Sequence, residues 1–212
     1  MDAVEALQLA DWRRQVAEMY ARWRRDSDAD PEQATLQLRA DRDELFRSHP
    51  QSPIPGTSRV RFGALSYFDY DADYRMRGAL EPAEPGGLQG QALRLPSSGA
   101  EQFSFVLVGR VRLAGPLEGA VLPIYWMHGY AGGLFVPFRD ATSGSETYGA
   151  GRYLLDSVKG ADLGGDHASG ELMLDFNLAY HPSCSYDPKW NCPLAPPRSR
   201  LAMRVEAGER LG

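Results

Sequence analysis

Hydrophobic residues follow a helical period at the start of the chain and a strand period over most of the rest. Within residues 3–25 the apolar positions recur at three- and four-residue steps and form one stripe, made of Leu9, Trp12, Val16, Met19, Tyr20 and Trp23. This pattern predicts an amphipathic helix over 3–25.

A second helix is predicted directly after this one. Asp30 is suited to cap it, Pro31 to occupy its first position, and Gln33 to complete a capping box. The helix should end by Ser48, because three prolines follow in HPQSPIPG.

From residue 59 onward the apolar positions predict strands. Segment 59–68 places Val60, Phe62 and Ala64 on one face. Segment 102–115 alternates more clearly, with Gly109 at the position of a bulge or tight bend. Its apolar face consists of Phe103, Phe105, Leu107, Val111 and Leu113.

Further strands are predicted over 119–127, 133–138, 170–180 and 201–208. Pro123 and Pro137 should lie at edges, bulges or strand ends, because proline cannot donate to a strand ladder. The aligned apolar positions of the last two segments are Leu172, Leu174, Phe176, Leu178 and Tyr180, and Leu201, Met203 and Val205.

These elements predict a mainly β (α+β) fold of about seven to nine strands. Segment 81–90 is the most loop-like stretch, and no long helix is expected between 100 and 200, so the sheet should be antiparallel. A curled sheet, a sandwich or a β-barrel would satisfy the pattern, with two N-terminal helices packed outside or capping one end. We expect one domain over 1–212, with a helical segment 1–48 and a β part 59–212.

Net charge and hydropathy indicate which partners the protein is not expected to bind. The formal net charge of −5 disfavours a nucleic-acid partner. No apolar run approaches the ~20 residues of a membrane span, and the first residues lack the features of a signal peptide. We therefore expect a cytoplasmic protein that binds neither nucleic acid nor membrane, and its oligomeric state stays open.

Three long segments resemble the DUF1684 family of bacterial and archaeal proteins of unknown function. They are LFVPFRDATSGSETYGAGRYL, LDFNLAYHPSCSYDPKWNCPLAPP and RSRLAMRVEAGE, and the resemblance extends from roughly residue 40 to the end. It implies a β-rich fold and no particular reaction. One departure is His181, because members of the family usually have asparagine before the equivalent of Pro182.

The polar segment 139–152 is the main candidate site. A ligand-binding interpretation uses Arg139 or Arg152 as a clamp for an anion and Asp140 or Glu146 as catalytic acid or base. The candidate ligand-binding residues are Arg139, Thr142, Ser143, Glu146, Tyr148, Arg152, Asp175 and Asn177. The segment has neither a phosphate-loop lysine motif nor a G-x-S-x-G nucleophile motif.

A structural interpretation of the same segment is equally open. It joins Arg139, Asp140, Glu146 and Arg152 in one charge network with Tyr148 packed beside it. Breaking such a network by replacing Glu146 or Arg152 with alanine should cost about 3 kcal/mol or more. Asp175 and Asn177 lie on the opposite face from their apolar neighbours, so they either line a cavity together with this segment or face solvent.

His181, Cys184 and Cys192 raise the question of a metal. Their spacing is unusual for zinc and no fourth ligand is apparent, so we expect structural thiols first, a disulfide second and zinc third. His128, in a turn between strands, is expected to be solvated. The sequence therefore predicts no metal and no cofactor.

Three functions fit these residues. The first is a β-rich protein that binds a small polar or anionic molecule. The second is a metal-independent enzyme with a carboxylate and arginine site at 139–152. The third is a structural or interaction protein in which these polar residues are internal scaffolding.

Overall fold

The computed structural model describes residues 2–82, 92–130 and 132–212. Its helices are α1 (Ala3–Asp26), α2 (Pro31–Ser48) and α3 (Gly56–Arg59). Its strands are β1 (Ser66–Tyr67), β2 (Arg75–Ala79), β3 (Glu81–Pro82), β4 (Ala92–Arg94), β5 (Ser104–Arg112), β6 (Val121–Met127), β7 (Leu134–Phe138), β8 (Arg152–Asp156), β9 (Gly165–Asp166), β10 (Glu171–Asp175) and β11 (Glu209–Arg210). Most of the loop predicted over 81–90 lies outside the described residues.

The two long helices begin where their capping residues are. Asp2 accepts a hydrogen bond from the Glu5 amide (2.8 Å), and the Glu5 carboxylate accepts one from the Asp2 amide (2.9 Å). Asp30 accepts from the Gln33 amide (3.0 Å) at the start of α2. Both predicted helices are confirmed.

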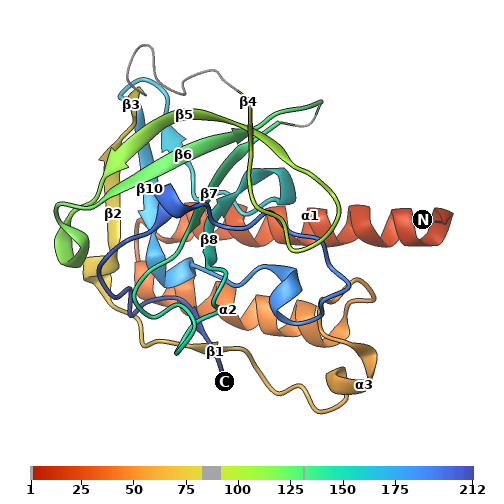
Figure 1. Ribbon diagram of the computed structural model, residues 1–212. Helices are drawn as coiled ribbons and strands as arrows, with labels where there is room; N and C mark the ends of the chain where they lie inside the picture. Colours follow the sequence, from red (N-terminus) through yellow and green to blue (C-terminus); the bar gives the residue numbers. More distant parts are fainter. Residues whose placement is uncertain (1, 83–91, 131) are drawn as a thin grey trace.

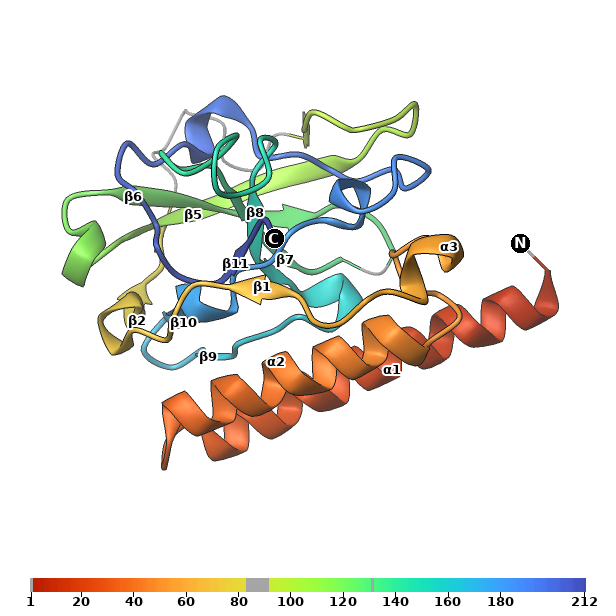
Figure 2. The same ribbon diagram turned by 90° about the horizontal axis from the view of Figure 1, so that it is seen from below.

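The helices lie side by side along one side of the strands (Figures 1 and 2), and the N-terminal end of α1 projects beyond them in Figure 2. Met19, Tyr20 and Trp23 of α1 and Leu38 and Leu45 of α2 are buried in one main core that also includes side chains of β5, β6, β7, β8 and β10. Each such burial contributes about 1.5–3 kcal/mol, so the helices are held by apolar packing against the strands.

The strands form three antiparallel sheets in the described part of the chain (Figure 1). Six strands follow the order β3-β5-β6-β7-β8 with β4 also on β5, three follow β2-β10-β9, and β1 pairs with β11. The mainly β fold with antiparallel sheets is confirmed. The barrel is wrong: the described sheets are open, because β10 pairs with β2 instead of closing on β8, and the strands number eleven.

A bulge in β5 divides the face that was predicted to be continuous. Leu107 is paired with Tyr125 and Gly109 with Ile124, so Val108 is the extra residue of the predicted bulge. An extra residue reverses the alternation of all that follow. Phe103, Phe105 and Leu107 therefore join a second, aromatic core with Leu95, Tyr125, Phe135 and Tyr153, whereas Val111 and Leu113 join the main core.

Pro123 and Pro137 lie at positions of the strands where a missing amide donor is tolerated. The pairing of β7 with β8 shifts between Val136 and Pro137, which confirms a bulge. Pro123 pairs with Arg110 of β5, and the described β6–β7 pairs begin only at Tyr125, so this part of β6 is paired on one side.

Three predicted strands are shorter or absent. Residues 59–65 form the end of α3 and turns, and Val60 is 89% exposed. β10 ends at Asp175, because its side chain accepts the Asn177 amide and starts a 3₁₀ turn. Over 201–208 the apolar side chains are buried without forming a ladder, since the chain bonds to Arg139 and Asp140 instead.

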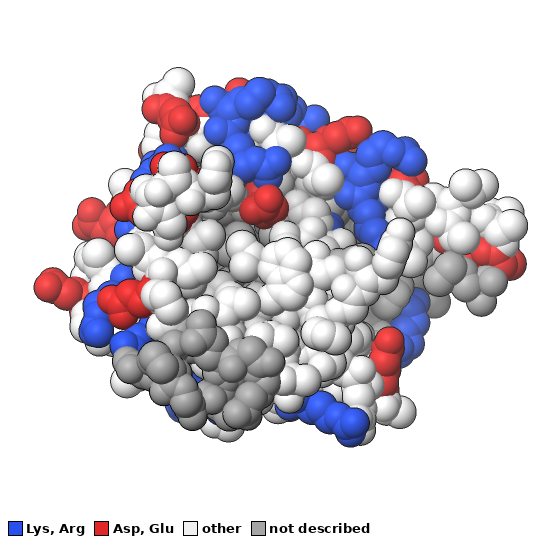
Figure 3. All heavy atoms as spheres, turned by 90° about the horizontal axis from the view of Figure 1, so that it is seen from above, with Lys and Arg blue, Asp and Glu red and all other residues white. Residues whose placement is uncertain are grey.

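The face seen in Figure 3 has an uncharged centre. Basic and acidic side chains alternate around its rim.

Candidate functional site

Asp140 and Arg152 form a fully buried ion pair that fastens the segment 139–152. Arg152 Nη2 lies 3.3 Å from Asp140 Oδ1, and neither side chain is exposed. Asp140 Oδ2 accepts from the Thr142 amide and hydroxyl and from the Val205 amide. Both carboxylate oxygens are therefore engaged by protein donors.

Arg152 joins this segment to the end of the chain. Its Nη1 donates to the carbonyls of Ala207 and Glu209, and its Nη2 to the carbonyl of Val205 (2.9 Å). Burial lowers the pKa of Arg152, and the Asp140 carboxylate opposes that shift. The guanidinium therefore holds the irregular segment 205–208 in place.

The single charge network predicted for this segment is wrong. Glu146 pairs with Arg204 (2.7 Å), with side chains 41% and 47% exposed, and not with Arg152. Arg139 makes no ion pair within the described residues, and its main chain bridges to Arg200. Only the Asp140–Arg152 half of the network is present.

The hydroxyl groups of the segment have separate partners. Thr142 Oγ1 lies 2.9 Å from Thr147 Oγ1, and Ser143 Oγ donates to Asp140 Oδ1 (3.2 Å). The Tyr148 hydroxyl lies 3.8 Å from Cys184 Sγ. The structure therefore brings Thr142 and Ser143 to Asp140, and places Tyr148 against a thiol.

Asp175 and Asn177 lie apart from this segment. Both are fully buried, so a solvent-facing position is wrong. Asp175 Oδ1 accepts two bonds from Asn177 (3.0 Å each), and the Asn177 amide exchanges hydrogen bonds with the main chain of Asp71. Burial raises the pKa of Asp175 to about 6, against the opposing effects of Asn177 and Arg75.

A second buried charge cluster surrounds Glu209, which the sequence did not indicate. Glu209 Oε2 accepts from Arg42 Nη1 (2.7 Å) and from the His181 amide (3.1 Å). Oε1 accepts from the Tyr186 hydroxyl and lies 3.2 Å from His181 Nδ1. Burial alone would raise the pKa of Glu209, but Arg42, His181 and Tyr186 outweigh it and lower it to about 2.

His181 is fixed by two hydrogen bonds. Its Nε2 accepts from the Tyr148 amide (3.1 Å), so Nδ1 carries the proton and donates to Glu209. Because both ring nitrogens are engaged, this histidine orients Glu209 and the 181–186 turn. His181 thus takes part in the cluster.

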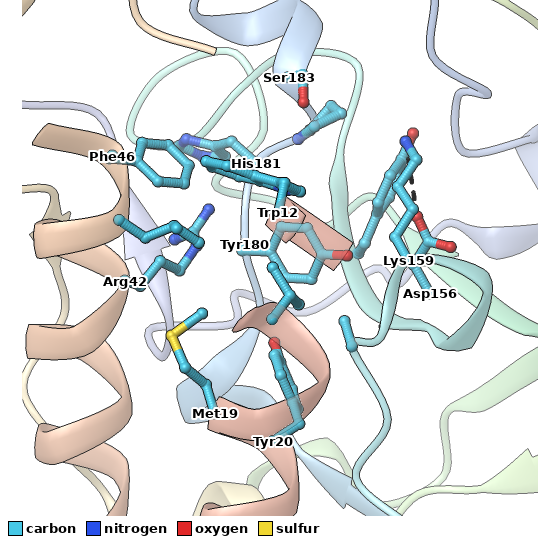
Figure 4. A pocket seen from close by; sticks show the side chains of 15 residues that line it. Trp12, Met19, Tyr20, Arg42, Phe46, Asp156, Lys159, Tyr180, His181 and Ser183 are labelled. Carbon is cyan, nitrogen blue, oxygen red and sulfur yellow. Dashed lines mark ion pairs between the residues drawn. The ribbon is translucent and has the colours of Figure 1, made fainter. Parts of the chain in front are cut away.

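The Glu209 cluster borders a cavity of about 70 Å³ between α1, α2 and the end of β8 (Figure 4). Its apolar wall includes Trp12, Val16 and Met19 of α1 and Leu45 and Phe46 of α2. Its polar wall comprises Tyr20, Arg42, Asp156, Lys159, Tyr180 and His181.

Three of these polar groups have donors without a protein acceptor. Among the described residues, no group accepts from the hydroxyls of Tyr20 and Tyr180, or from Nε and Nη2 of Arg42. Tyr20 is 3% exposed and Arg42 is 8% exposed. These donors line the cavity and keep some accessible surface, so water or a ligand acceptor can reach them there.

Asp156 and Lys159 separate this cavity from an outer hollow of about 300 Å³, which they also line. The hollow lies against the aromatic core, with Phe103, Phe105 and Phe135 on its floor. Burial raises the pKa of Asp156, and Lys159, 3.9 Å away, opposes the shift.

The thiols of Cys184 and Cys192 are unbridged and buried. Within the described ranges, no group of three or more His, Cys, Asp or Glu side chains is placed to hold a metal ion. His128 is exposed. None of the helices described is both long and apolar enough to cross a membrane.

A solved structure of another protein has a similar fold. The fold is similar to that of an uncharacterized protein of Haloarcula marismortui solved by solution NMR, with 34% identity and a TM-score of 0.59, covering 88% of this chain and 97% of that one. The model of the family described as protein of unknown function (DUF1684) matches residues 60–210. The chain belongs to the DUF1684 family. A search of curated proteins found no match.

One signal for the cavity was present in the sequence. Arg42 lies four residues after Leu38 and three before Leu45, so a charge interrupts the apolar stripe of α2. Tyr20 was assigned to the core, and nothing in its sequence context shows that its hydroxyl lacks an acceptor. Glu209 carries no signal, because it follows a turn near the end of the chain.

Proposed function

We propose that the protein binds a small monocarboxylate with a short apolar tail in the cavity between α1 and α2. The observation that carries this proposal is the pair Tyr20 and Arg42, both more than nine-tenths buried, with donors that no described protein group accepts. A carboxylate is the acceptor that arginine and tyrosine donors bind most strongly.

The charge of Arg42 supports an anion. Burial would lower its pKa, but Glu209 and Tyr67 outweigh this and raise it well above the ordinary value. One guanidinium nitrogen holds Glu209 and Tyr67, and the remaining donors are left for a ligand. Phe46 and Tyr180 stack on the guanidinium at 4.7 and 5.0 Å and fix its plane.

Asp156 supports a carboxylate rather than a dianion. Burial raises its pKa, and the negative charge that Asp156 carries repels a dianion more strongly than a monocarboxylate. For a second negative charge on the ligand, Lys159 is the only cation besides Arg42 that lines the cavity within the described residues.

The apolar wall and the volume of the cavity limit the size of the ligand's apolar tail. An apolar cavity of ~150 Å³ accommodates the six heavy atoms of benzene, so about 70 Å³ suits a molecule of roughly three to four heavy atoms. Trp12, Val16 and Phe46 exclude a second polar end. Acetate is a probe of this size and charge.

Thermal unfolding with acetate tests the proposal. Acetate at 100 times its dissociation constant should add about 2.7 kcal/mol to the free energy of unfolding. Acetamide and ethylamine, which are of similar size without the negative charge, should add little. Chloride at equal ionic strength controls for salt.

Two variants test whether the ligand binds in the cavity between α1 and α2. Tyr20→Phe removes one donor and should weaken acetate binding about tenfold or more, whereas Tyr130→Phe, at a fully exposed tyrosine, should not change it. Val16→Phe should fill the cavity and abolish binding. Equal stabilisation by acetate and acetamide, or unchanged binding in both cavity variants, contradicts the proposal.

The outer hollow is the alternative location. Phe103→Asp, which places a charge in the wall of the hollow, should leave acetate binding unchanged if the inner cavity is the site. An enzyme acting through Asp140 or Glu146 has less support, because Asp140 is saturated by protein donors and Glu146 is paired at an exposed turn.

A further inference from the structure

The outer hollow of about 300 Å³ is lined by charges of both signs and by aromatic rings. Among the described residues that line it, Arg13 and Lys159 are cations, and Asp156 and Glu101 are carboxylates. These formal charges sum to zero. A hollow of this kind is complementary to a ligand that carries one charge of each sign.

Asp156 is the most enclosed of these charges, with 6% exposure. No side-chain hydrogen bond reaches its carboxylate within the described residues, and Lys159 Nζ lies 3.9 Å from Oδ2, beyond hydrogen-bond distance (Figure 4). A buried carboxylate is stabilised by a charged donor in direct contact. An ammonium group in the hollow would supply that donor.

Arg13 stands beside Asp156 because the turn after β8 packs on α1. Gly160 approaches α1 so closely that a Cβ on it would lie 2.8 Å from the Ala17 amide nitrogen. Arg13 precedes Ala17 by four residues, so it lies on the same face of the helix, one turn away. The guanidinium therefore borders the hollow from the side of α1.

Arg13 is a cation that the protein does not use elsewhere. Among the described residues its exposed side chain makes no ion pair and no side-chain hydrogen bond. The next residue of α1, Arg14, pairs with Asp11 at 2.7 Å. Arg13 is thus placed to bind a ligand carboxylate, with Asp156 next to it for an ammonium group.

The aromatic wall of the hollow suits a ring. Phe105 and Phe135 are stacked with ring centroids 5.0 Å apart and are 1% and 2% exposed, so their positions are fixed. Phe103 and Met127 are partly exposed beside them. On the scale at which ~150 Å³ accommodates benzene, about 300 Å³ suits about twelve heavy atoms, which is the size of phenylalanine.

We propose that the outer hollow binds a free aromatic α-amino acid. Its ammonium group pairs with Asp156, its carboxylate with Arg13, and its ring packs against the wall of Phe103, Phe105 and Phe135. Among the described residues the hollow shares only Asp156 and Lys159 with the cavity between α1 and α2. The proposal therefore does not rest on the binding of a monocarboxylate.

Calorimetric titration with three probes tests whether both charged ends are recognised. L-Phenylalanine has both ends, phenethylamine lacks the carboxylate, and 3-phenylpropanoate lacks the ammonium group. We expect phenylalanine to bind at least about tenfold more tightly than either of the other two, since each lacks one charge-assisted contact.

Matched variants assign the two ends. Arg13→Gln should weaken phenylalanine binding about tenfold and leave phenethylamine binding unchanged, whereas Arg14→Gln should change neither. Asp156→Asn should weaken both probes that carry an ammonium group and spare 3-phenylpropanoate. If Asp156→Asn does not fold, the exposed Arg13 variant decides the question.

Two further variants separate this site from the cavity between α1 and α2. Phe103→Asp should abolish phenylalanine binding and retain acetate binding, and Val16→Phe should do the reverse. Three results would overturn the proposal: no binding of phenylalanine to the folded protein, equal affinity for the three probes, or loss of phenylalanine binding in Val16→Phe with retention in Phe103→Asp.

Discussion

Two buried ion pairs hold the C-terminal part of the chain, and they differ in what surrounds the arginine. In Asp140–Arg152 both terminal nitrogens of the guanidinium donate to main-chain carbonyls or to Asp140. In Arg42–Glu209 the carboxylate is saturated by four donors, whereas the arginine uses one nitrogen and borders a cavity. The arginine of the first pair is enclosed by protein with Nε unpartnered, and the arginine of the second has unpartnered nitrogens beside a cavity.

This difference shows that a buried charge pair alone does not distinguish scaffold from site. Both pairs have buried side chains and an arginine stacked on aromatic rings, Arg152 on Phe138 and Arg42 on Phe46. Each arginine also has a nitrogen without an acceptor, so what distinguishes Arg42 is that it borders a cavity.

Removal of Arg152 should give the largest effect. Arg152→Met leaves Asp140 without its cation and removes the donors of three carbonyls, so we expect a loss of about 4–5 kcal/mol in the free energy of unfolding. Denaturant unfolding measures it, with Arg61→Met as an exposed control. A loss below about 1 kcal/mol would show that this pair is not the fastening of the segment.

Glu209→Gln should have the next largest effect, with a dependence on pH. The folded pKa of Glu209, about 2, lies below its ordinary value of 4.5, so its contribution is complete above pH 4.5 and is lost as pH falls towards 2. The shift corresponds to about 3 kcal/mol. The cost of Glu209→Gln should therefore be about 3 kcal/mol at pH 7 and shrink progressively below pH 4.5.

Comparison of the two unfolding curves at each pH isolates this contribution. Asp175 acts in the opposite direction, since its raised pKa of about 6 makes its contribution fall as pH rises from about 4 to 6. Because Asp175 is present in both proteins, its effect cancels in the difference. A cost of Glu209→Gln that is constant down to pH 3 would contradict the assignment of Glu209 as a strongly stabilised anion.

The two long helices and the strands β1, β5, β6, β7 and β10 were predictable because their signals are local. The caps at Asp2 and Asp30 and the stripe ending at Trp23 depend only on neighbouring residues. The position of the bulge was predictable from Gly109, but not that Val108 would be the extra residue that turns Val111 to the other core.

The candidate site was less predictable because it depends on distant partners. Asp140 and Arg152 are twelve positions apart and were correctly joined. Arg42 and Glu209 are 167 positions apart, and neither local spacing nor composition brings them together. The same holds for Glu146, whose partner Arg204 lies 58 positions away and outside the segment.

Glu146→Ala should have the smallest effect on the free energy of unfolding. It tests an exposed ion pair against the two buried ones. The sequence predicts a loss of about 3 kcal/mol, on the assumption that Glu146 joins Arg152. In the structure Glu146 pairs with Arg204 at the surface, and Arg204 retains Glu206 at 2.7 Å when Glu146 is removed. An exposed pair contributes about 0–1 kcal/mol, so the variant should lose less than about 0.5 kcal/mol, and high salt should reduce the loss further. Arg204→Ala is the matched control, and a double-mutant cycle gives the coupling energy directly. A loss near 3 kcal/mol for Glu146→Ala would restore the single network and place Glu146 beside Asp140 and Arg152.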